Sequence, residues 1–123
     1  MKMNYFVVGT NDKDAATRFY DALFETTEYN QVMSTDRMTY WMADGDAFAV
    51  AIPFDENPAT NGNGTMVGFN VGTNENVDGL YQKAIELGGT CEGAPEQRGP
   101  YYSAYVRDLD KNKLCFGALL EAA

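Results

Sequence analysis

An internal repeat is the feature of this sequence that most restricts the fold it can adopt. When the chain is shifted by 61 residues, close to half of its 123-residue length, apolar positions fall on apolar positions. Tyr20 then falls on Tyr81, and Phe24 falls on Ile85. This self-similarity predicts that the chain consists of two modules with the same order of elements.

Each half of the chain predicts a strand, a helix and three further strands. In the first half these are a strand at 3–8, a helix capped by Asn11 or Asp12, and strands at 29–34, 38–43 and 47–52. In the second half they are a strand at 65–71, a helix at 74–87 that Gly88 ends, a weak strand near Thr90 followed by a loop at 93–99, and strands at 101–107 and 113–119. The order is β, α, β, β, β in both halves, which is typical of an α+β fold.

The boundary between the modules is marked by composition. Residues 53–64 read PFDENPATNGNG, with the prolines, glycines and asparagines of a loop. We therefore expect one domain over residues 1–123, made of a first βαβββ module at 1–54, a linker at 55–64 and a second βαβββ module at 65–123.

Charge and cysteine content limit the partners of this chain. Eighteen acidic and nine basic residues give a net charge of −9, which would repel a nucleic acid backbone. No apolar run reaches the length of a membrane span, and the N-terminus lacks the pattern of a signal peptide. We therefore expect a cytoplasmic protein without nucleic acid or membrane partners, in which Cys91 and Cys115 stay reduced.

The absence of histidine restricts the chemistry further. The chain has no His, the residue type that most often serves as a general base and as a transition-metal ligand. Any site must therefore use other side chains.

The last quarter of the chain predicts a hairpin with two distinct faces. Its hinge, residues 108–112, carries Asp and Asn side chains that can satisfy the backbone of a tight reversal. On the strand that follows, period-two alternation separates the apolar Leu114, Phe116 and Ala118 from Lys113, Cys115 and Gly117. The first face can pack under a helix, and the second, centred on Cys115, points to the opposite side of the sheet.

The chain resembles a known superfamily in the double βαβββ pattern, in the segment NDKDAATRFYDALF and in the hairpin YVRDLDKNKL. It is similar to the vicinal oxygen chelate superfamily, which includes glyoxalase I, extradiol dioxygenases, and bleomycin and fosfomycin resistance proteins. The stretches PFDENPATNGNGTMVGF and EGAPEQRGPYYSAYVRD resemble a bacterial subgroup of glyoxalase/bleomycin resistance/dioxygenase proteins. The resemblance implies curved mixed sheets that form a cleft, in which active members hold a divalent metal.

The metal ligands of the family are missing at the matching positions. The first-strand positions of the two halves are Tyr5 and Met66, and the last-strand positions are Ala49 and Cys115. A metal site needs three or four converging N, O or S ligands, and this set supplies too few. We therefore expect no metal and no cofactor, and we do not expect metal-dependent glyoxalase I activity.

Strand parity predicts which residues line the cleft. Phe6, Val8, Val67, Phe69, Leu114 and Phe116 are expected under the helices. The opposite face presents Val7, Gly68, Gly117 and, from the hairpin, Ser103, together with the predicted ligand-binding residues, which are Tyr5, Met66, Asn70, Tyr101, Tyr105, Arg107 and Cys115. A lining of tyrosine rings and sulfur-containing side chains favours a small apolar or aromatic molecule.

Each of these residues also has a plain structural interpretation. Cys115 would be a buried inert thiol, because no His, adjacent Lys or helix N-terminus is predicted beside it. Arg107 would fix the hairpin turn rather than hold a ligand carboxylate. The tyrosines would pack their rings and hydrogen-bond the backbone.

Two classes of function follow from the sequence. The first is a glyoxalase/bleomycin resistance-like protein whose metal-free cleft binds a small molecule. The alternative is a glyoxalase-like lyase or isomerase that acts without the usual metal ligands, and a purely structural dimer would leave the cleft packed shut. A homodimer is expected because Tyr40 and Trp41 on the strand at 38–43 provide aromatic surface that one domain would leave uncovered, although Trp41 fits the core or the pocket wall equally well.

Overall fold

The computed structural model describes residues 1–119 of the chain. The last four residues of the predicted second module, 120–123, lie outside the described residues. The elements, in chain order, are β1 (Tyr5–Gly9), α1 (Lys13–Leu23), the short 3₁₀ helix η1 (Phe24–Thr26), β2 (Asn30–Ser34), β3 (Met38–Ala43), β4 (Asp46–Ala51), β5 (Met66–Asn70), α2 (Asn74–Glu86), β6 (Thr90–Arg98), β7 (Tyr101–Arg107) and β8 (Lys113–Leu119).

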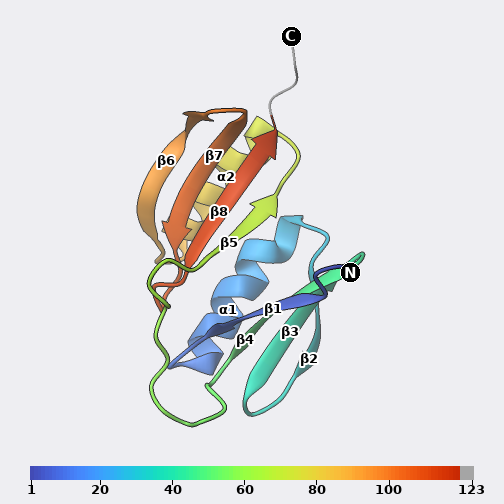
Figure 1. Cartoon of the computed structure of the whole chain (residues 1–123), viewed down its shortest axis with the longest axis vertical. Helices are drawn as coiled ribbons and strands as arrows, with labels where there is room; N and C mark the ends of the chain where they lie inside the picture. The colour runs from blue at the N-terminus through green and yellow to red at the C-terminus, as the bar shows by residue number, and fades with distance from the viewer. Residues whose placement is uncertain (120–123) are drawn as a thin grey trace.

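The strands form two four-stranded mixed sheets of the same topology. Sheet A has the order β1-β4-β3-β2, and sheet B has the order β5-β8-β7-β6 (Figure 1). In each sheet the first strand pairs parallel with the last, and the other pairs are antiparallel. The predicted α+β fold of two βαβββ modules is confirmed.

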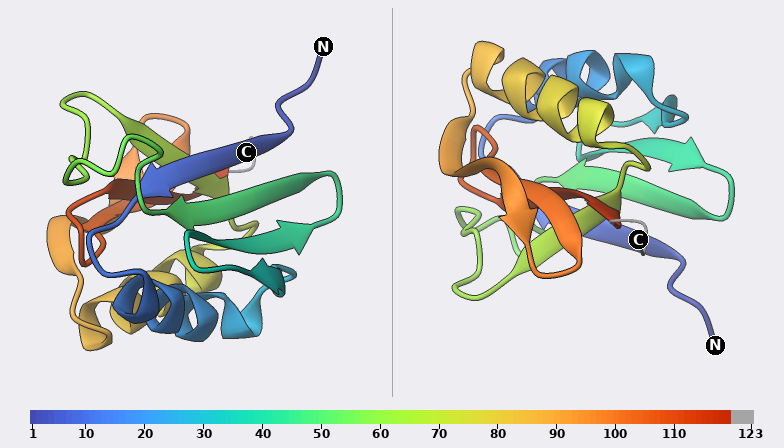
Figure 2. Two further views of the ribbon diagram at one scale, coloured as in Figure 1. Left: turned by 90° about the horizontal axis from the view of Figure 1, so that it is seen from below. Right: turned by 90° about the horizontal axis from the view of Figure 1, so that it is seen from above.

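Both helices begin at capped residues and cover the same side of the two sheets. The Asp12 side chain accepts a hydrogen bond from the Ala15 N–H at 3.0 Å, and Thr73 caps α2 in the same way through the Asn76 N–H at 3.1 Å. Figure 2 shows α1 and α2 side by side on one side of the molecule. The other face of each sheet, called here its open face, carries no helix.

One hydrophobic core joins the two modules beneath the helices. Tyr20 of α1 and Val77 of α2 are fully buried in it, together with Leu114 and Phe116 of β8. The Phe69 ring of β5 bridges the halves: it lies 5.9 Å from the Phe24 ring and 5.7 Å from the Phe48 ring. The predicted apolar face of β8, with Leu114, Phe116 and Ala118, is confirmed.

The prediction of a loop at 93–99 is wrong. Residues 93–98 continue β6, which pairs with β7 from Thr90 to Arg98 through two irregularities in register, between Cys91 and Gly93 and between Gly93 and Glu96. Pro95, which has no backbone N–H to donate, lies on the edge strand β6, in the irregularity between Gly93 and Glu96. The Gly and Pro residues that suggested a loop fit into this strand because bulges at a sheet edge tolerate them.

Two apolar residues differ from their predicted environments. Phe6, expected under the helices, lies on the edge strand β1 and is 37% exposed. Trp41, expected on an uncovered surface, is 1% exposed, and its indole N–H donates to the Asp21 carboxylate at 2.8 Å. Trp41 therefore belongs to the core and leaves Tyr40 as the aromatic residue of β3 available to a partner.

The hinge of the last hairpin has the side-chain hydrogen bonds that the sequence predicts. Asp108 Oδ1 accepts from the backbone N–H groups of Asp110 and Asn112, both at 2.9 Å. The Asn112 side chain donates to the Gly9 carbonyl at 2.9 Å and thereby ties the hinge to the end of β1. The reversal is therefore held by its own side chains and by the other module.

The residues between β4 and β5 are fastened to the first module although they form no helix or strand. The Asn11 side chain accepts from the Ala59 N–H at 2.7 Å and donates to the Ala59 carbonyl at 3.2 Å. A Cβ at Gly9 would lie 2.9 Å from the Ala59 Cβ, so this close approach requires glycine.

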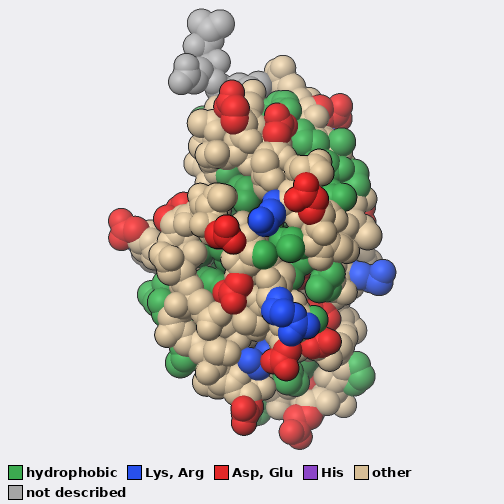
Figure 3. Space-filling view, turned by 180° about the vertical axis from the view of Figure 1, so that it is seen from behind, with side chains coloured by type: hydrophobic (Ala, Val, Ile, Leu, Met, Phe, Trp, Pro, Cys, Tyr) green, Lys and Arg blue, Asp and Glu red, His purple; other side chains and the backbone are tan. Residues whose placement is uncertain are grey.

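The back of the molecule, over the helices, is mixed in character. Figure 3 shows acidic side chains scattered over it and hydrophobic atoms in small separate groups. Within residues 1–119, neither helix is long and apolar enough to cross a membrane.

Candidate functional site

A hollow of about 320 Å³ lies on the open face of sheet B. Strand pairing builds its floor from two rows of residues, because paired residues share a face. One row joins Gly68, Cys115 and Tyr105, and the next joins Asn70, Gly117 and Ser103. Four of the seven predicted ligand-binding residues, Asn70, Tyr101, Tyr105 and Cys115, line this hollow.

Two glycines in the floor leave the space open. A Cβ at Gly68 would have no atom within 4 Å, and one at Gly117 would meet only ordinary contacts, with Tyr101 Cδ1 at 3.8 Å and Ser103 Cβ at 3.9 Å. Both backbones are extended and accept side chains. The hollow is therefore produced by missing side-chain volume rather than by strained backbone.

Tyr105 is the centre of the charged side of the hollow. The Arg98 guanidinium carbon lies 5.0 Å from the Tyr105 ring centroid, and Lys113 Nζ lies 5.1 Å from it. Tyr105 is paired with Cys115 across β7 and β8, so the two side chains lie on the same face. Two cations therefore flank one aromatic wall in a chain whose net charge is −9.

Cys115 is not poised as a nucleophile. Burial raises the pKa of its thiol, and this effect outweighs the hydrogen bond with Tyr105 and the charges of Arg98 and Lys113, which lower the pKa. The thiol is therefore protonated at neutral pH, as the interpretation of Cys115 as an inert thiol expects.

Arg98 and Ser103 line the hollow but are absent from the predicted set. Arg98 lies in the segment expected to be a loop, so its strand face could not be assigned from the sequence. Its guanidinium donates to the Ser103 carbonyl, donates to the Ala94 carbonyl at 2.8 Å and pairs with Glu96 at 3.3 Å. The alternation along β7 places Ser103 on the same face as Tyr101 and Tyr105, and this parity is the signal that identifies it.

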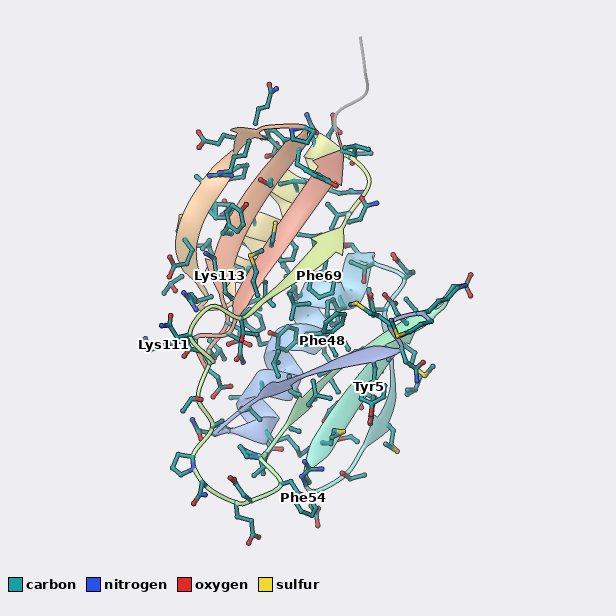
Figure 4. All side chains as sticks on the ribbon, viewed as in Figure 1. Tyr5, Phe48, Phe54, Phe69, Lys111 and Lys113 are labelled. Atoms are coloured by element: carbon teal, nitrogen blue, oxygen red, sulfur yellow. The ribbon has the colours of Figure 1, made fainter. Side chains whose placement is uncertain are left out.

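The other three predicted residues lie elsewhere. Tyr5 is on sheet A, 54% exposed, with its ring 6.3 Å from the Tyr40 ring, and Figure 4 shows it well away from Lys113 of sheet B. Met66 is exposed at the start of β5. Arg107 pairs with Glu92 at 2.8 Å and donates to the Lys111 carbonyl at 3.0 Å, so it supports the hairpin turn.

A second hollow, of about 540 Å³, follows the seam between the modules. Phe24 and Tyr29 line it from the first module, and Phe69 and Gly79 line it from the second. It shares Gly68, Phe69 and Asn70 with the first hollow, so β5 separates the two spaces. None of the four positions expected for metal ligands lines it.

The family model of the Glyoxalase/Bleomycin resistance protein/Dioxygenase superfamily matches residues 2–116. The chain belongs to this superfamily. A solved glyoxalase/bleomycin resistance protein from Albidiferax ferrireducens T118 is 33% identical, with a TM-score of 0.89 over 94% of this chain and 97% of that chain.

More distant solved structures share the fold. A glyoxalase-related enzyme from Fulvimarina pelagi is 18% identical, with a TM-score of 0.81 over 96% of this chain and 88% of that chain. A lactoylglutathione lyase from Agrobacterium tumefaciens is 18% identical, with a TM-score of 0.73 over 95% of this chain and 92% of that chain. No curated protein matches the chain.

The metal of the superfamily does not fit the residues of this member. Ala49 offers no donor and Met66 only a thioether, which leaves Tyr5 and Cys115, and two ligands are too few to hold a metal ion. In the part of the chain that the structure describes, no group of three or more His, Cys, Asp or Glu side chains is placed to hold a metal ion. The chemistry of this site must therefore be argued from its own side chains.

Proposed function

We propose that this protein binds a small apolar or aromatic molecule, without a metal, in the hollow on the open face of sheet B. The observation that carries the proposal is the position of this hollow. It lies over Cys115, one of the positions expected for a metal ligand. The rings of Tyr101 and Tyr105 and the glycines of the floor line the hollow where metal ligands would be expected. Its volume falls at the lower end of the range of small-molecule sites.

The affinity of such a site should be modest. At roughly 25 cal/mol per Å² of apolar area, a ligand that buries about 200 Å² gains on the order of 5 kcal/mol before entropy costs. A free energy of about 5 kcal/mol corresponds to a dissociation constant of roughly 0.2 mM, so the apolar contacts alone supply only weak binding. Binding, rather than turnover, is favoured because the Cys115 thiol is protonated.

Filling the hollow should abolish binding. In Gly68→Leu the new side chain enters open space, so we expect a folded protein that no longer shifts the Cys115 and Tyr105 resonances when monocyclic aromatic fragments are added. The measurement is an NMR fragment titration, with elemental analysis of the purified protein to check that no metal is retained through dialysis.

The matched control is Gly79→Leu, which enters open space in the seam hollow instead. It should leave fragment binding unchanged. Binding that survives Gly68→Leu, or a stoichiometric transition metal in the purified protein, would contradict the proposal.

We also propose that a second copy of the chain covers the open face of sheet A. Strand register places four exposed apolar side chains on this face, and they are Tyr5, Val7, Met33 and Met42. Contiguous exposed apolar surface of this kind is typical of interfaces. We further propose a cytoplasmic location, because a reducing compartment keeps the free thiols Cys91 and Cys115 reduced.

Val7→Glu should convert the dimer to a monomer. A buried, unpaired carboxylate at the interface is strongly unfavourable, whereas Leu109→Glu, an exposed position in the hinge, should leave the dimer intact. Light scattering at micromolar concentration measures both. A wild-type monomer would rule out the proposed interface.

A further inference from the structure

Ser103 is a buried hydroxyl without a partner. The residue is 3% exposed and lines the sheet B hollow. Its Oγ is the one buried side-chain N or O atom within residues 1–119 that makes no hydrogen bond. Buried hydroxyl groups are normally hydrogen-bonded, so this oxygen indicates a bond that the free chain does not make.

The surroundings of Ser103 are positively charged. Arg98 donates to the Ser103 carbonyl, and Lys113 lies over the same Tyr105 ring as Arg98. A Cβ at Gly93 would lie 2.9 Å from Arg98 Nη2, so only glycine leaves room for the guanidinium in this position. Glu96 offsets part of this charge, but its side chain is mostly exposed, which screens it.

Tyr101 is the side chain best placed to admit a ligand to this oxygen. Ser103 Oγ has no contact with solvent, so a ligand reaches it only if a neighbour moves. Tyr101 is half exposed, follows a turn at Gly99 with φ of 60°, and leans over Gly117, the residue paired with Ser103. Its ring can swing outward without disturbing the core.

We propose that the ligand of this hollow is a small aromatic carboxylate, whose oxygen accepts a hydrogen bond from Ser103 Oγ while Arg98 and Lys113 supply the complementary charge. This inference rests on the proposed function and specifies its ligand class. The hydroxyl can donate to an acceptor, the two cations favour an anionic acceptor over a neutral one, and the Tyr101 and Tyr105 rings favour a flat body.

Benzoate, benzyl alcohol and benzylamine are suitable probes because they share a ring and differ in charge. We expect benzoate to bind the wild-type protein at least about tenfold more tightly than benzylamine in an NMR titration at pH 7. Ser103→Ala should lower the affinity for benzoate about tenfold and leave the affinity for benzylamine nearly unchanged. Lys113→Gln should lower the affinity for benzoate about threefold. Added salt should reduce the difference in benzoate affinity between the wild type and this variant.

Thermal unfolding separates a binding role from a structural one. Ser103→Ala removes an unpaired buried hydroxyl, so the melting temperature of the free protein should stay the same or rise. The matched control is Ser34→Ala on β2, whose hydroxyl bonds the Thr39 hydroxyl at 3.0 Å, and it should leave benzoate affinity unchanged. A lower melting temperature with unchanged benzoate affinity in Ser103→Ala would overturn the inference.

The two proposals fail in different ways. If none of the three probes binds the hollow, the proposed function itself fails. If all three bind with similar affinity and Ser103→Ala changes none of them, the hollow is a ligand site but the carboxylate assignment is wrong.

Discussion

Replacing Phe48 by Ala should lower the free energy of unfolding by about 3–5 kcal/mol, the range for deleting a large buried aromatic side chain. Phe48 is 1% exposed, and its ring lies 4.7 Å from Tyr20 and 5.7 Å from both Phe24 and Phe69. Figure 4 shows Phe48 and Phe69 close together where the two halves meet. The cavity would therefore open at the junction and weaken both modules at once.

Urea unfolding followed by circular dichroism measures this effect, and Phe54→Ala is the matched control. Phe54 lies in the loop at the edge of the molecule, is 87% exposed and makes only a cation–π contact with Arg37 at 5.5 Å. Its loss should change the free energy of unfolding by less than about 1 kcal/mol. Equal effects of the two substitutions, or separate transitions for the two halves in the wild type, would show that the halves do not share one core.

Replacing Asp108 by Ala should destabilise the protein by about 3 kcal/mol or more, because several buried donors lose their acceptor together. Asp108 Oδ2 accepts from the Tyr20 hydroxyl at 2.5 Å and from the Asn112 side chain at 3.0 Å, in addition to the two backbone bonds of the hinge. Burial and the neighbouring carboxylate raise the pKa of Tyr20 well above its usual value, so its hydroxyl remains a donor.

A double-mutant cycle with Tyr20→Phe isolates the bond between the modules. Tyr20→Phe removes the donor and leaves the ring, so Asp108→Ala should cost less in that background, with a coupling of about 1–3 kcal/mol. The exposed Asp36→Ala serves as the charge control and should have little effect. Additive free energies in the cycle would mean that this contact does not connect the halves.

Local patterns in the sequence predict most elements of this fold. Period-two alternation places Leu114 and Phe116 toward the helices and Cys115 away from them, because side chains of a strand point to alternate faces whatever it pairs with. The hinge is equally local: Asp108 and Asn112 hold their own turn. The same parity brings Asn70, Tyr101, Tyr105 and Cys115 to one face before any tertiary contact is known.

β6 could not be predicted in this way. Its Gly and Pro content is typical of a loop, and it becomes a strand because β7 offers a partner along its whole length. That pairing brings Arg98 over Tyr105 and beside the Ser103 carbonyl. The charge of the candidate site is therefore a consequence of a strand that local propensity does not indicate.

The sequence by itself determined the repeat, the start of the first helix at Asn11 or Asp12, the last hairpin and the faces of its strands, since these depend on contacts within a few residues. The tertiary structure alone decided that Tyr5 and Cys115 belong to different sheets, that Trp41 enters the core and that Ser103 is buried without a partner. Strand parity says which residues share a face. Only the packing of the two modules against each other says which side chains become buried, because that depends on contacts between residues far apart in the chain.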